Sequence, residues 1–180
     1  YSALISERGY EYLIGSVHSV TDGSGQLIHI GERPCTKEEL SIYTDDYIEM
    51  LSSGLFIYGA HPDFIAAAGF ECEDAFASCA EAIARCAADI GIPIEINCHG
   101  FNKPKIQCAD GSLRAPYPYL PFWEIAAQKG VKVVIGMDSH KPENVVRHRE
   151  RAVELAMGLG LEYYTRAESL MDNYRRISKK

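Results

Sequence analysis

The amino-acid sequence predicts an α/β protein built on a parallel sheet, and two observations support that prediction. Short apolar runs that suit strands alternate with amphipathic stretches that suit helices, and strict alternation favours parallel strands joined by helical crossovers. The strand-like runs are continuously apolar, as expected for strands covered on both faces. The chain has 180 residues, enough for a substantial core, so we expect residues 1–180 to form a single domain.

Five segments are predicted to be strands, and the fourth of them, VKVVIGM, is the clearest. They lie at 11–17, 55–60, 92–97, 131–137 and 161–165. A closed (β/α) barrel usually needs about eight strands. Five strands therefore predict either an open sheet or the C-terminal part of a barrel.

Helices are predicted before, between and after these strands. The segment TKEE at 36–39 is a capping box, with Thr36 as the N-cap and Glu39 three residues later, and Gly54 is expected to end the helix that it starts. The other predicted helices cover 1–8, about 74–90, the segment FWEIAAQKG, a stretch from Pro142 to about 158, and a terminal stretch through Tyr174.

The composition excludes several classes of function. A net charge of −7 argues against broad nucleic-acid binding, which needs a basic surface. We see no signal peptide and no apolar run of the ~20 residues that span a bilayer, so no membrane association is expected. Six cysteines without a C-x-x-C pair fit free thiols in a reducing cytoplasm. Cys72, Cys79 and Cys86 are spaced by sevens, and we interpret them as small apolar residues near one helix face.

Polar residues with metal-binding side chains follow four of the predicted strands. His18 and His61 come about one residue after the first and second strands, and Asp138 directly follows the fourth. Asn97 and His99 lie at the end of the third strand, and His140 comes two residues after Asp138. The carboxyl ends of parallel strands are where α/β folds build their sites. We therefore expect these side chains to meet at one edge of the sheet.

Histidine and carboxylate side chains are the usual ligands of zinc, manganese and iron. Two or more such metals could bind a phosphate or activate a water. A lone histidine after a strand is more often a hydrogen-bonded loop residue, but four strand ends together favour a site. His29 and His148 fit no such pattern, and His148, in the charged segment RHRER, is expected on a solvated helix face.

Five stretches around these residues resemble the histidinol-phosphate phosphatases of the PHP superfamily (polymerase and histidinol phosphatase). They read YLIGSVH, YGAHPDFI, EINCHGFNKPK, PYPYLPFWEIA and VKVVIGMDSHKPENV. The resemblance covers nearly the whole chain in the correct order. It implies the C-terminal part of a distorted seven-stranded, TIM-like (β/α) barrel with a trinuclear metal centre.

The resemblance also implies an activity and roles for particular residues. The activity is metal-dependent hydrolysis of L-histidinol phosphate to L-histidinol and phosphate, a step of histidine biosynthesis, with two to three divalent metals (zinc, manganese or iron). His18 and His61 match the histidines on one metal, and Asp138 and His140 match ligands of the others. Lys103 is the first choice to hold the substrate phosphate and Arg114 the second, with Asn97 and His99 as further substrate-binding candidates.

Several features depart from the family pattern. The N-terminal H-x-H motif, the next histidines and the bridging glutamate would precede SVH, and Asn102 stands where members often carry arginine. We therefore expect the C-terminal two thirds of such an enzyme, with partial or no metal occupancy and little activity. Two alternatives are a PHP phosphoesterase for another small phosphate, and a non-catalytic module that covers its open sheet edges by forming a homo-oligomer.

Overall fold

A four-stranded parallel sheet forms the centre of the molecule. The structure is a computed structural model and describes residues 2–108 and 111–178. The strands are β1 (Leu13–Gly15), β4 (Phe56–Gly59), β5 (Ile94–Asn97) and β8 (Val133–Gly136), arranged in the order β1-β4-β5-β8 and all parallel. The sheet confirms the α/β prediction and four of the five predicted strand positions.

The fifth predicted strand is reduced to a single bridge. Tyr163 pairs with Val133 as an isolated parallel bridge, held by Val133 N–H to the Glu162 carbonyl at 2.8 Å and Tyr164 N–H to the Val133 carbonyl at 2.9 Å. An apolar pattern reports burial, not the number of ladder hydrogen bonds. The segment is extended and lies against β8, so the prediction of a strand there was wrong in extent.

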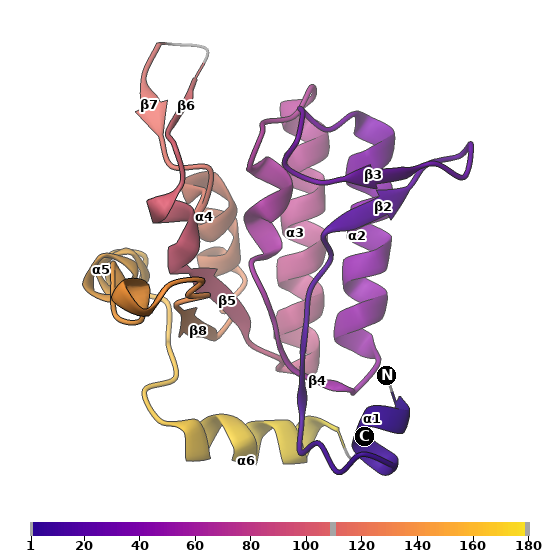
Figure 1. Ribbon diagram of the computed structural model, residues 1–180, viewed down its shortest axis with the longest axis vertical. Helices are drawn as coiled ribbons and strands as arrows, with labels where there is room; N and C mark the ends of the chain where they lie inside the picture. The colour runs from indigo at the N-terminus through magenta and orange to yellow at the C-terminus, as the bar shows by residue number, and fades with distance from the viewer. Residues whose placement is uncertain (1, 109–110, 179–180) are drawn as a thin grey trace.

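Helices cover the sheet and close its amino edge. They are α1 (Ser2–Ser6), α2 (Lys37–Ser52), α3 (Glu73–Ile90), α4 (Leu120–Gln128), α5 (Arg149–Gly158) and α6 (Ala167–Ile177). Figure 1 shows α2 and α3 side by side, with α4 next to α3. Helix α6 contacts the amino ends of two strands, since Tyr174 Oη donates to the Leu55 carbonyl and Asn173 Nδ2 to the Gly91 carbonyl. At the carboxyl edge, two short 3₁₀ helices follow the central strands, η1 (Pro62–Ala66) after β4 and η2 (Cys98–Asn102) after β5.

The helix predicted from Pro142 starts later than expected. The segment begins with a single 3₁₀ turn, η3 (Pro142–Asn144), and α5 starts only at Arg149. His148 stands between them with a φ of 65°, a left-handed conformation that interrupts a helix. Its half-buried ring packs against Phe101 with centroids 5.6 Å apart, so the prediction of a solvated helix face was wrong.

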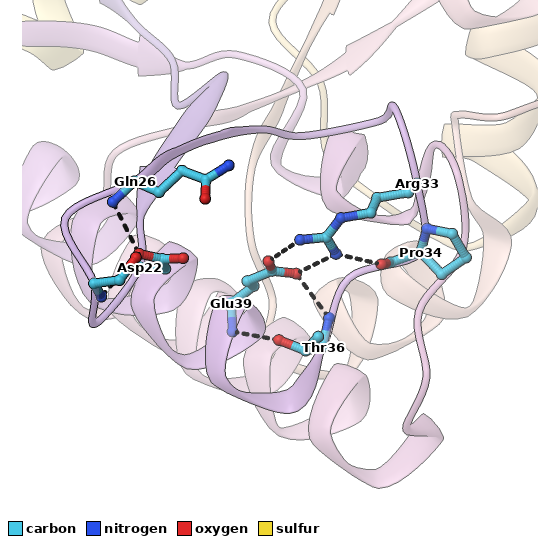
Figure 2. Close-up of polar contacts among 7 residues, drawn as sticks. Asp22, Gln26, Arg33, Pro34, Thr36 and Glu39 are labelled. Atoms are coloured by element: carbon cyan, nitrogen blue, oxygen red, sulfur yellow. Dashed lines mark hydrogen bonds and ion pairs between the residues drawn. The ribbon is translucent and has the colours of Figure 1, made fainter.

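The capping box at the start of α2 is confirmed. Thr36 Oγ1 accepts from Glu39 N–H at 3.2 Å, and Glu39 Oε2 accepts from Thr36 N–H at 2.9 Å. Figure 2 shows that Arg33 reaches the same carboxylate, donating to Glu39 Oε2 at 3.0 Å. The Arg33 guanidinium holds the pKa of the Glu39 carboxyl below its usual range. These contacts fix the start of α2.

Replacing Thr36 by alanine should destabilise the protein, because it removes the acceptor of one unpaired helix N–H. We expect Thr36→Ala to cost about 1 kcal/mol and to lower the Tm by roughly 2–4 °C in thermal denaturation followed by circular dichroism. Thr36→Ser keeps a hydroxyl in place and is the matched control. Equal losses in both variants would show that the threonine methyl, and not the cap, supplies the stability.

Two hairpins, neither of them predicted, lie beyond the carboxyl edge of the sheet (Figure 1). Strand β2 (Ser19–Thr21) pairs with β3 (Leu27–His29), and β6 (Ile106–Gln107) pairs with β7 (Leu113–Arg114), both antiparallel. Asp22 closes the first turn, since its Oδ1 accepts from Ser24 N–H and Gln26 N–H, both at 2.9 Å. The second hairpin lies between β5 and α4, where no strand was predicted.

The cysteines contribute to packing rather than to cross-links. All six are free. Cys79 is buried in the core beside α2, and Cys86 is half-buried against that core. Cys72 is the N-cap residue of α3. This confirms the interpretation as small apolar side chains for Cys79 and Cys86, whereas Cys72 precedes the helix and is not part of the hydrophobic core. No helix in the described part of the chain is long and apolar enough to cross a bilayer.

Candidate functional site

The predicted strand-end residues line one cavity at the carboxyl edge of the sheet. His18 lies in the loop after β1 and His61 in the turn after β4. Asn97 ends β5, and Asp138 follows β8. The cavity has a volume of about 590 Å³, and the residues predicted for the site that line it are His18, His61, Asn97, His99, Lys103, Asp138 and His140. The structure thus brings together side chains from all four strand ends.

One pair of histidines occupies the β1–β4 side of the cavity. The ring centroids of His18 and His61 lie 4.8 Å apart, edge to face, and Phe64 packs against both rings. Burial, followed by the neighbouring His18, lowers the pKa of His61 to about 4. His61 Nδ1 is buried with no hydrogen-bond partner in the structure. The ring is therefore neutral at physiological pH and has a nitrogen free for a further bond.

A second pair of histidines occupies the β5–β8 side. The rings of His99 and His140 lie 4.4 Å apart. His140 Nδ1 lies 2.9 Å from the Asp138 carbonyl oxygen and 3.8 Å from its carboxylate. Burial and the neighbouring Lys103 lower the pKa of His99. His99, a predicted substrate-binding residue, therefore lies beside the predicted metal ligands Asp138 and His140.

A buried glutamate that the sequence reasoning missed lies between the two sides. Glu95 is only 4% exposed. Its Oε2 accepts from His61 N–H at 3.2 Å and from Asn97 Nδ2 at 2.8 Å. Asn97 Nδ2 also lies 3.3 Å from Asp138 Oδ2. The segment IPIEIN did indicate an unusual residue, because a single charged side chain inside an apolar buried strand needs polar partners.

The buried Glu95 should make stability depend on pH. Burial raises its pKa to about 7, against an ordinary value of 4.5. Between these values the folded state keeps a proton that the unfolded state has lost, so stability falls as the pH rises through this range. Glu95→Gln cannot titrate. We expect the free energy of unfolding of wild type, relative to this variant, to decline by up to about 3 kcal/mol.

Urea denaturation of both proteins from about pH 5 to about pH 8 measures this difference. Taking the difference cancels the titration of His61, whose lowered pKa acts in the opposite direction. Burial raises the pKa of Asp63 to about 6, and its charge also raises the pKa of Glu95, so the difference includes the coupling between these two carboxyl groups. A difference that stays constant with pH would show that Glu95 titrates alike in the folded and unfolded states.

Two of the predicted ligands stand in strained backbone conformations. His61 has a φ of 32° and Asp138 a φ of 44°. Residues other than glycine rarely adopt the left-handed region, and those that do are held there by surrounding contacts. Such outliers concentrate at functional sites. Here they turn the chain sharply at the ends of β4 and β8.

The two predicted phosphate-binding cations differ in position. Lys103 is exposed and lines the cavity. Arg114 is not among the lining residues: its guanidinium donates to the carbonyls of Ala66, Ala115 and Pro116 and lies 4.3 Å from the Tyr119 ring centroid. These backbone contacts occupy its donors, so the structure does not bring Arg114 to the cavity.

The side chains that line the cavity are of chemical types that bind divalent metals, namely imidazole and carboxylate groups. The unpartnered Nδ1 atoms of His61 and His99 are consistent with this. Across residues 2–108 and 111–178, however, no three His, Cys, Asp or Glu side chains lie close enough together to hold one ion. The described cavity therefore offers metal ligands in pairs.

Comparisons with known proteins show the fold. No protein-family model matches the chain, and no curated protein matches its sequence. Among solved structures, it is similar to the histidinol phosphate phosphatase HisK of Lactococcus lactis, determined in complex with zinc, L-histidinol and phosphate. The two chains are 15% identical with a TM-score of 0.56, and the match covers 90% of this chain and 61% of that one. The chain therefore shares the fold of this phosphatase over most of its own length and over less than two thirds of the length of the phosphatase.

Proposed function

We propose that the chain is a metal-dependent phosphomonoester hydrolase whose substrate is L-histidinol phosphate. The observation that carries the proposal is the single cavity in which the predicted ligands His18, His61, Asp138 and His140 meet Lys103. The likeness to a phosphatase fold whose structure holds zinc, L-histidinol and phosphate supports it. The products would be L-histidinol and phosphate, which places the reaction in histidine biosynthesis.

In this proposal His18 and His61 hold one metal, and Asp138 and His140 contribute to the binding of one or two more. Zinc, manganese or iron would each suit these ligands. Bound metals would activate water and neutralise charge on the phosphoryl oxygens. Lys103 supplies a cation at the cavity wall for the phosphate. Asn97 and His99 also line the cavity and are the further candidates for contact with the substrate.

We also propose that the four strands form part of a distorted seven-stranded barrel within one domain spanning residues 1–180. The parallel order β1-β4-β5-β8, with the site at the carboxyl edge, agrees with such a barrel. The chain spans 61% of the length of the similar structure. Because the match covers less than two thirds of that phosphatase, its activity is proposed for this chain.

Phosphate release from L-histidinol phosphate in the presence of Mn²⁺ or Zn²⁺ tests the function. We expect weak release that depends on added metal and stops with a chelator. A panel of sugar, amino-alcohol and nucleotide phosphates distinguishes histidinol phosphate from another small substrate, the alternative that the same cavity permits. Release that is unaffected by metal removal, or absent with every phosphate, would contradict the proposal.

A homo-oligomer is a second proposal, favoured by the open edge of the sheet. Strand β1 lies at one end of the strand order, and no other strand in the described ranges pairs with its outer side. Ile14 in the middle of this strand is 50% exposed. Unpaired edge strands favour pairing between chains. We expect a dimer in sedimentation velocity, and a stable monomer at high concentration would speak against it.

A further inference from the structure

One buried carboxylate at the site, Glu95, has no part in the proposed ligand set. It projects from the middle of β5 and lies over Gly136 of β8, where a Cβ atom would collide with the glutamate carboxylate. Only glycine at position 136 leaves room for this side chain. The glutamate side chain therefore packs closely against β8, where it forms part of the cavity wall.

Glu95 contacts the backbone of one strained residue directly. Its Oε2 accepts from the N–H of His61, which has a φ of 32°. A left-handed residue that is not glycine persists only where its surroundings hold it. The bond from Glu95 fixes the His61 backbone at the point where the chain turns out of β4.

Glu95 contacts the second strained residue through Asn97. The same oxygen accepts from Asn97 Nδ2 at 2.8 Å, and that amide lies 3.3 Å from Asp138 Oδ2. Asn97 is itself fixed, because its Oδ1 accepts from His99 N–H at 2.8 Å. One buried oxygen thus connects the turns that follow β4 and β8.

We propose that Glu95 is a positioning residue, whose carboxylate holds the His61 backbone and, through the Asn97 amide, the Asp138 side chain in the orientation needed to bind metal. The proposal rests on the proposed function only in treating His61 and Asp138 as metal ligands. Glu95 acts as a hydrogen-bond acceptor and does not itself bind the ion. Removing a residue that hydrogen-bonds to a metal ligand usually lowers metal affinity by about 10- to 100-fold.

Titration with Mn²⁺, followed by electron paramagnetic resonance of the free ion, measures this effect. Mn²⁺ is the suitable probe because the six free cysteines would compete for zinc, whereas thiolates are poor ligands of manganese. We expect Glu95→Ala to weaken Mn²⁺ binding at least about 10-fold. Glu95→Gln retains an acceptor oxygen and should stay within about 3-fold of wild type.

Glu39→Ala is the matched control, because it also removes a buried, hydrogen-bonded carboxylate but lies at the start of α2. It should lower stability and leave Mn²⁺ affinity unchanged. If Glu95→Gln loses as much affinity as Glu95→Ala, the charge of Glu95 acts on the metal and the positioning role is wrong. Unchanged affinity in Glu95→Ala would also overturn it.

Amide hydrogen exchange by NMR tests positioning without metal. The His61 amide should be protected in wild type and in Glu95→Gln, and should exchange freely in Glu95→Ala. If wild type binds no Mn²⁺, the proposed function fails, while this measurement still decides the positioning role. Should Glu95→Ala not fold, Asn97→Ser keeps an acceptor for His99 N–H but loses the amide link to Asp138. It is expected to lose about 10-fold in Mn²⁺ affinity, and unchanged affinity would overturn the proposal.

Discussion

Replacing His61 by asparagine should reduce both Mn²⁺ affinity and metal-dependent phosphate release by roughly 100-fold or more. Loss of a residue that hydrogen-bonds to a metal ligand costs about 10- to 100-fold in affinity, and a direct ligand contributes more than such a residue. Asparagine is the informative substitution because it tolerates the left-handed conformation at this position, where φ is 32°. The variant therefore removes the imidazole and keeps the turn. Calorimetric or resonance titration and a phosphate-release assay measure the two losses.

His29→Asn is the matched control for this prediction. His29 lies on β3, its ring is 2.8 Å from Ser19 Oγ, and it is not among the residues that line the cavity. It should retain metal affinity and activity within about 2-fold, as surface substitutions away from a site usually do. Equal losses in the two variants would mean that general histidine binding, and not the cavity, holds the metal.

The sequence predicted where these side chains meet because the topology of a parallel sheet determines where the strand ends lie. Once the strands are parallel, their carboxyl ends must share one edge, so His18, His61, Asn97 and Asp138 had to lie near one another. Continuous apolar runs indicated the strands, and the segment TKEE indicated the start of α2. These features depend on local chemistry that can be recognised without knowing what each residue contacts.

The remaining features depend on contacts between distant segments. Glu95 contacts His61, 34 residues away, and nothing in IPIEIN indicates which partner satisfies its charge. Arg114 looked available for a phosphate, but the carbonyl of Ala66, 48 residues away, helps to occupy it. The left-handed turns at His61 and Asp138 likewise follow from tertiary packing, since neither residue type demands that conformation.

Gly136→Ala should be among the most damaging small substitutions in this chain. The three heavy atoms nearest to a Cβ at position 136 all belong to the Glu95 side chain. The carboxylate would have to leave His61 N–H and Asn97 Nδ2 and turn toward the adjoining cavity, which removes both hydrogen bonds of a side chain that is only 4% exposed. Overpacking together with a displaced buried acceptor should cost about 3 kcal/mol or more, which lowers the Tm by roughly 6–12 °C.

Gly158→Ala is the control for this loss. A Cβ there meets nothing within 4 Å, so alanine at the end of α5 should be neutral or slightly stabilising. The double variant Gly136→Ala with Glu95→Ala then separates the cause. Removing the glutamate side chain removes the atoms with which the new methyl collides, so the double variant should be more stable than the sum of the two single losses predicts. Additive losses would mean that glycine is needed at position 136 for its backbone conformation. They would also mean that contact with β8 does not fix the position of the Glu95 side chain.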